Sequence, residues 1–186
     1  MVYSIVAYGD PVLRKKAQEI DKDYPELDKF IANMFDTMYA SSGVGLAAPQ
    51  VGKSIRVFVV DGEPFAEDDE TMVNFKKAFI NPIITHEEGE KWAFNEGCLS
   101  IPKIREDVER HKKLTITYYD ENWVQHTEEY DGLKARIIQH EYDHLEGILF
   151  IDKLNPLKRK LLQGKLNDIT RGKVRTDYKM RFPKLK

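Results

Sequence analysis

The run His140-Glu141-Tyr142-Asp143-His144 constrains this chain more than any other part of its sequence. In an α-helix, residues four apart lie on one face, so His140 and His144 can direct imidazole nitrogens at the same metal ion. Glu141 lies next to the first of them, where its carboxylate can take a proton from a water on that metal. The pattern predicts a metal-binding helix that carries a general acid/base. The alternative for Glu141 is an ordinary exposed helix residue.

A third metal ligand has to come from elsewhere in the chain. Zinc proteases with this helix take it from downstream, as in H-E-x-x-H-x-x-G-x-x-H. Here Gly147 is in place, but Phe150 occupies the position of the last His, and no further His or Glu follows. A few downstream Asp and Asn residues are weaker candidates than Cys98, the only cysteine. The alternative for a lone cysteine is a small buried side chain without a chemical role.

Three segments resemble the three sequence motifs of bacterial peptide deformylases, in the same order and at similar spacings. They read GVGLAAPQ at 43–50, EGCLS at 96–100 and QHEYDH at 139–144. With the flanking segments 10–14 and 149–152, the resemblance covers most of residues 1–155. It implies that Cys98, His140 and His144 hold the metal. It also implies a hydrolase that removes formate from the N-formylmethionine at the start of nascent polypeptides.

The resemblance assigns further roles at this site. Glu141 would be the general acid/base, and the oxyanion would be stabilised by the side-chain amide of Gln50, the backbone N–H of Leu99 and the metal. Gly45 would offer its carbonyl to the substrate; the alternative is that the glycines of this segment only form a turn. The implied cofactor is Fe²⁺, with Zn²⁺, Ni²⁺ or Co²⁺ as substitutes. The donor set alone does not select iron over zinc.

The methionine side chain of the substrate needs an apolar pocket. By alignment with the motifs, its candidate residues are Val44, Gly45, Leu133, Ile137 and Arg136. Arg136 is a departure, because many relatives carry an aliphatic residue there. We expect its aliphatic stem to line the pocket while its guanidinium reaches water.

Arg105, seven residues after Cys98, matches a family arginine. We expect it to pair with Glu96 or another carboxylate and hold the cysteine loop, with a surface arginine as the alternative. The remaining histidines show no ligand-like spacing and are expected at the surface or in packing. They are His86, His111 and His126.

Periodicity and turn residues predict one catalytic domain over residues 1–186. The expected order is a helix at 25–40, a loop at 41–52, a strand at 55–60, an exposed acidic loop at 61–74, short strands at 78–88, 91–95 and 107–111, a hairpin of 114–119 and 124–130, the metal-binding helix at 133–146, and a helix from Asn155-Pro156 to about 170. This order predicts an α+β fold, with antiparallel strands packed around the central metal-binding helix and additional N-terminal and C-terminal helices. The resemblance implies the same architecture.

Charge divides the chain into an acidic body and a basic C-terminal helix and tail (155–186). Residues 153–186 contain 12 Lys or Arg and two acidic residues, which leaves 17 basic and 29 acidic residues in 1–152. The basic end is a candidate contact for ribosomal RNA, with a solvated helix and frayed end as the alternative. No membrane-length apolar run or signal peptide is present, and the single cysteine suits a reducing cytoplasm. We expect a cytoplasmic protein with no membrane or specific DNA partner.

Three other functions fit the sequence less well than that of a deformylase. A zinc endopeptidase is disfavoured by the missing downstream ligand. A structural metal module is disfavoured because structural zinc sites normally have four protein ligands. A family member with a changed substrate is disfavoured by the intact Gln50, Leu99 and Glu141.

Overall fold

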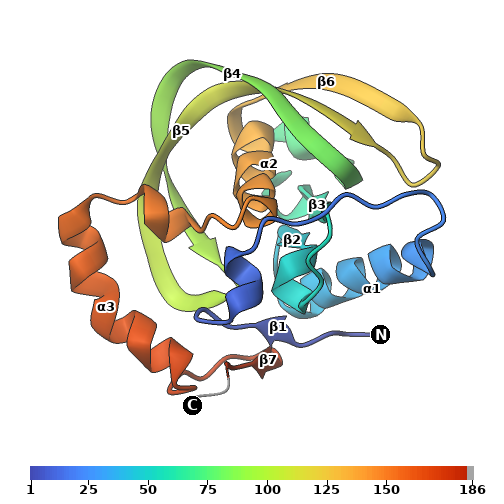
Figure 1. Cartoon of the computed structure of the whole chain (residues 1–186). Helices are drawn as coiled ribbons and strands as arrows, with labels where there is room; N and C mark the ends of the chain where they lie inside the picture. Colours follow the sequence, from blue (N-terminus) through green and yellow to red (C-terminus); the bar gives the residue numbers. More distant parts are fainter. Residues whose placement is uncertain (184–186) are drawn as a thin grey trace.

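A five-stranded antiparallel sheet curves around one central helix, α2 (Gly132–Leu145), in the computed structural model, which describes residues 1–183 (Figure 1). The strand order is β2-β3-β4-β5-β6. The bounds are β2 (Gly45–Ala47), β3 (Val57–Asp61), β4 (Lys76–Cys98), β5 (Ile101–Tyr119) and β6 (Gln125–Asp131). The predicted α+β fold, with antiparallel strands around a central helix, is confirmed.

Two strands are much longer than the sequence predicted. β4 has 23 residues and β5 has 19, so the short strands expected at 78–88 and 91–95 are one strand, as are those at 107–111 and 114–119. The pairing of β4 with β5 shifts register at several points, for example between Glu88 and Lys91. Such irregularities bend and twist a strand pair, and this hairpin arches over α2 (Figure 1).

The helix α2 is buried on almost every side. Its apolar residues Ala135, Ile138 and Leu145 pack into the core, but Gln139 and His144 are buried as well. A helix that buries polar side chains needs partners for them on the surrounding strands. Its observed bounds differ by one residue at each end from the predicted 133–146.

The other two helices begin with different local signals. α3 (Pro156–Thr170) starts as predicted, with the Asn155 side chain accepting a hydrogen bond from the Lys158 N–H at 2.9 Å. α1 (Leu27–Ala40) starts later than the predicted residue 25, and Glu26 before it has a positive φ of 53°.

The two predicted loops contain more structure than expected. Segment 41–52 includes β2 and a 3-10 helix (Ala48–Val51), and segment 61–74 includes two short 3-10 helices (Glu63–Phe65 and Glu70–Met72). Met72 is fully buried, so the second segment is not only an exposed loop.

After α3 the chain returns to the N-terminal segment. β7 (Met180–Arg181) pairs in parallel with β1 (Ile5–Val6), a two-stranded sheet that was not predicted (Figure 1). Among the described residues, no helix has the length and apolar character needed to span a membrane.

Candidate metal centre and active site

Cys98, His140 and His144 each place one donor atom within 4.8 Å of the others. Cys98 ends β4, and the two histidines lie one turn apart on α2. Cys98 Sγ is 3.4 Å from His144 Nε2. A tetrahedral ion with S and N bonds of about 2.3 and 2.1 Å would set these atoms about 3.6 Å apart. The three predicted ligands therefore lie where they could hold one divalent ion.

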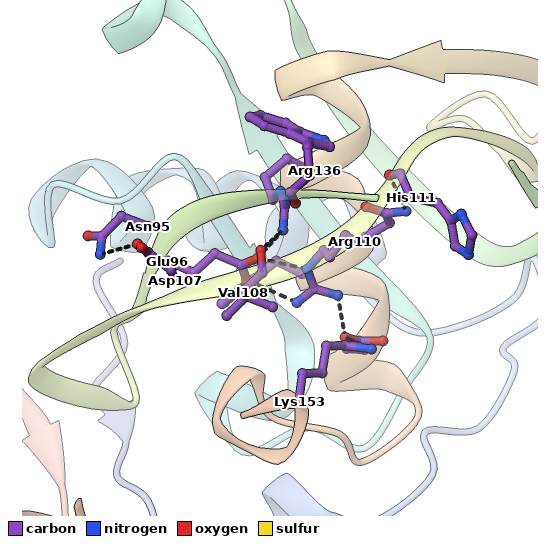
Figure 2. A network of polar contacts seen from close by, with 12 residues as sticks. Asn95, Glu96, Asp107, Val108, Arg110, His111, Arg136 and Lys153 are labelled. Carbon is purple, nitrogen blue, oxygen red and sulfur yellow. Dashed lines mark hydrogen bonds and ion pairs between the residues drawn. The ribbon is translucent and has the colours of Figure 1, made fainter. Parts of the chain in front are cut away.

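Glu96 collects three partners behind this centre. Its carboxylate accepts two hydrogen bonds from Arg110 and one from Arg136, at 2.8 to 2.9 Å (Figure 2). The carboxylate also lies 2.8 Å from His140 Nδ1. Because Nδ1 of His140 faces Glu96, the other ring nitrogen is turned toward Cys98 and His144. Burial alone would raise the pKa of Glu96, but His140 and Arg110 outweigh it and hold this pKa well below its usual range.

The expectation for Arg136 was partly wrong. Arg136 lines the cleft, but the residue is only 2% exposed, and its guanidinium does not reach water. It donates to Glu96, to the Val108 carbonyl at 2.8 Å and to the Trp92 carbonyl at 2.5 Å, and it lies over the Trp92 ring. The long hairpin supplies these partners, which the sequence did not reveal as neighbours.

The expectation that Arg105 pairs with Glu96 or another carboxylate was also wrong, and the alternative of a surface arginine is what the structure shows. Arg105 is exposed, and it donates to the side chain and the carbonyl of Asn95, both at 2.8 Å. Arg110 takes the predicted role, and it also pairs with Asp143 at 2.7 Å. A signal for this was present, because Arg110 continues the alternating buried positions Ile104 and Val108 along β5.

Glu141 is the other buried carboxylate of the site. It is 5% exposed, and its Oε2 has no hydrogen-bond partner among the described residues. Burial raises its pKa to about 7. A Cβ at Gly45 would lie 2.8 Å from Glu141 Cδ, so only glycine at this position leaves room for the carboxylate. The sequence had suggested a different reason for Gly45.

Gln50 is held beside the cysteine. Its Oε1 accepts the Ala47 N–H at 2.9 Å, which turns its Nε2 toward Cys98 Sγ and Ser100 Oγ, at 3.4 and 3.3 Å. The amide is 2% exposed, so it is not the solvated loop residue that a lone glutamine would be. One donor of a side-chain amide thus points into the centre, as an oxyanion donor must.

One cleft of about 440 Å³ opens onto these residues, a size typical of ligand pockets. Its lining includes the predicted pocket residues Val44, Gly45, Leu133, Ile137 and Arg136, together with Gln50, Cys98, Leu99, His140 and Glu141. It also includes residues that sequence reasoning missed, namely Phe65, Phe94 and the segment 176–178. The other histidines, His86, His111 and His126, do not line the cleft. His126 Nε2 lies 2.7 Å from Asp120 Oδ2.

Comparison with known proteins gives one consistent result. The sequence model of the polypeptide deformylase family matches residues 2–160. The peptide deformylase of Christiangramia forsetii is 58% identical, with 100% of this chain and 98% of that protein covered. The peptide deformylase of Flavobacterium psychrophilum is 55% identical, with 98% and 97% covered. The crystal structure of the peptide deformylase from Thermus thermophilus has a TM-score of 0.82 at 38% identity, covering 92% of this chain and 99% of that one.

Proposed function

The chain belongs to the peptide deformylase family, metallohydrolases that remove formyl groups from nascent peptides, and we propose that it deformylates N-formylmethionyl peptides with Cys98, His140, His144 and Glu141 at its active site. One observation carries this proposal. Three candidate metal ligands, Cys98, His140 and His144, converge beside a cleft lined by the first two. The same cleft is lined by Glu141, a buried carboxylate with one oxygen that has no hydrogen-bond partner among the described residues.

A divalent ion on Cys98, His140 and His144 would supply a nucleophile at neutral pH by lowering the pKa of water to about 7. We propose Fe²⁺ as this ion, with Zn²⁺, Ni²⁺ or Co²⁺ as substitutes. The cation would also lower the pKa of Glu141 and keep its carboxylate ionised. Glu141 can then accept a proton at its free oxygen and deliver it to the departing amine.

The remaining residues orient the substrate. The Gln50 amide and the Leu99 N–H would donate to the oxygen that gains negative charge, and losing one such donor typically costs about 10² to 10³ in rate. Gly45 would present its carbonyl to the peptide backbone. The methionine side chain would lie against Val44, Leu133, Ile137 and the stem of Arg136, all of which line the cleft.

We further propose that the basic C-terminal region contacts ribosomal RNA in the cytoplasm. Within α3 the buried residues are Leu162, Leu166 and Ile169. Lys158 pairs with Glu106 at 3.1 Å, whereas Arg159, Lys160 and Lys165 are exposed and available to a polyanion. Such binding should weaken steeply between about 50 and 200 mM salt. If the fraction of protein that cosediments with ribosomes is the same at low and high salt, this contact is contradicted.

A single assay tests the proposed activity. The protein is purified without oxygen, loaded with Fe²⁺ and incubated with a formyl-Met peptide, and both formate release and internal cleavage are measured. Formate without backbone cleavage is the expected result. Internal cleavage would indicate an endopeptidase, and neither product with metal bound would indicate a changed substrate or a structural site. Cys98→Ala should lower the metal content in elemental analysis, and unchanged stoichiometry would remove Cys98 from the centre.

A further inference from the structure

The segment 176–178 reaches the cleft from the end of the chain. Thr176, Asp177 and Tyr178 all line it, although they lie beyond the residues 2–160 that match the family model. None of the three belongs to the motifs that predicted the site. Their position raises the question of what they contribute to the reaction.

Tyr178 makes a direct contact with the turn that carries Leu99. Its hydroxyl donates to the Leu99 carbonyl at 2.8 Å. Leu99 and Ser100 form the turn between β4 and β5, directly after Cys98. Because the carbonyl of Leu99 is fixed from outside, the turn that presents the Leu99 N–H has less freedom to rotate.

The same turn is held at a second point by the other end of the chain. The Tyr8 N–H donates to the Ser100 carbonyl at 2.8 Å. On the inner side, Ser100 Oγ lies 3.3 Å from the amide nitrogen of Gln50. The N-terminal and C-terminal segments therefore hold the consecutive carbonyls of Leu99 and Ser100. The side chain of Ser100 in this turn contacts Gln50, the other proposed oxyanion donor.

The two chain ends are joined to each other by the β1–β7 pair. The Ile5 N–H donates to the Lys179 carbonyl at 2.8 Å, and the Ala7 N–H donates to the Arg181 carbonyl at 2.9 Å. Ile5 and Ala7 are fully buried, so this small sheet is anchored in the core. Just before β7, Thr176 Oγ1 donates a hydrogen bond to the Tyr178 carbonyl at 2.7 Å, which restrains the backbone of residues 176–178.

We propose that Tyr178 is a positioning residue for the reaction, delivered by the β1–β7 sheet to fix the Leu99-Ser100 turn. This inference rests on the proposed function, because the turn matters only if the Leu99 N–H binds the reacting oxygen. Tyr178 acts through Leu99, so its effect belongs to the turnover step more than to the binding of the peptide.

The test compares two hydroxyl deletions, Tyr178→Phe and Tyr3→Phe. Tyr3 is the matched control, because it is also half-buried, packs against the same core cluster and loses one hydrogen bond, with Asn33 at 3.1 Å. For the Fe²⁺ enzyme and a formyl-Met peptide, Tyr178→Phe should lower kcat by about three- to tenfold. Its KM should change by less than about twofold, and Tyr3→Phe should leave both constants unchanged.

Hydrogen exchange gives a readout that does not depend on turnover. Tyr178→Phe should speed amide exchange in a peptide spanning 97–102, and Tyr3→Phe should not. An unchanged kcat in Tyr178→Phe would overturn the proposal, and so would equal effects of the two substitutions. If the parent protein releases no formate, the proposed function fails instead, while unchanged exchange in Tyr178→Phe would still show that Leu99 is not held by this hydroxyl.

Discussion

The site contains two buried carboxylates, Glu96 and Glu141, and their surroundings are opposite. Glu96, on β4, contacts Arg110, Arg136 and His140, and its pKa is held well below the usual range. Glu141, on α2, has one oxygen without a partner among the described residues, and burial raises its pKa to about 7. Both residues are 5% exposed, so burial alone does not explain the difference.

Two carboxylates in one site can differ in whether they are able to exchange protons, depending on their neighbours. A carboxylate surrounded by guanidinium groups stays ionised, so it can orient a histidine but cannot exchange protons near neutral pH. A carboxylate without such partners can change its protonation state. Environments that push two pKa values apart are consistent with the proposed roles, in which Glu96 orients His140 and Glu141 transfers protons.

The largest effect on activity is expected from Glu141→Gln. The amide keeps the shape of the side chain but cannot accept a proton, so kcat should fall by about 10²- to 10⁴-fold. Metal content and melting temperature should stay close to those of the parent protein. Steady-state kinetics with a formyl-Met peptide measures this, and activity within about tenfold of the parent would reject the acid/base role.

The next effect is expected from Glu96→Gln, and it should appear in stability and metal binding. Removing this charge leaves Arg110 and Arg136 buried without their shared carboxylate, which typically costs about 3 to 5 kcal/mol. His140 also loses its orienting partner, so metal affinity should fall by about 10- to 100-fold. Urea unfolding and competition with a chelator measure the two quantities. If both stay at parental values, the network does not support the metal centre.

A smaller loss is expected from Arg136→Met. The thioether keeps much of the apolar volume, and Glu96 retains Arg110 and His140, so the loss should be about 1 to 3 kcal/mol of unfolding free energy. Arg105→Met is the matched control, because Arg105 is exposed and should change stability by less than about 0.5 kcal/mol. Equal urea midpoints for the two variants would show that the buried guanidinium adds nothing to stability.

The smallest effect is expected from Glu128→Gln, on the strand β6. Glu128 also gathers donors, from Lys77 at 3.0 Å and Tyr118 at 2.7 Å, but its side chain is 33% exposed. Ion pairs of this kind contribute about 0 to 1 kcal/mol and are screened by salt. Urea unfolding with and without 1 M NaCl measures this contribution, because the Debye length falls to about 3 Å at that ionic strength. If Glu128→Gln lowered the unfolding free energy as much as Glu96→Gln, burial would not explain the difference between the contacts of Glu96 and those of Glu128.

Local signals in the sequence predicted part of the fold well. The cap Asn155 before Pro156 marked the start of α3, and the helical spacing of His140 and His144 placed both on α2. The strand lengths were underestimated, because the exposed charged residues around Glu88 interrupt the apolar alternation while the backbone pairing continues. A strand's ladder is completed by its neighbour, which a single stretch of sequence does not contain.

The sequence by itself determined the family, the α+β architecture and the candidate residues Cys98, His140, His144 and Glu141, because motif order and helical spacing are properties of the chain. Only the tertiary structure decided that Arg136 is buried on Glu96, that Arg110 rather than Arg105 fills that role, and that Tyr178 reaches Leu99. The Glu96–Arg136 and Leu99–Tyr178 contacts join residues 40 and 79 positions apart. Alternation along β5 indicated locally that Arg110 is buried, but which residues a buried side chain contacts depends on such long-range packing.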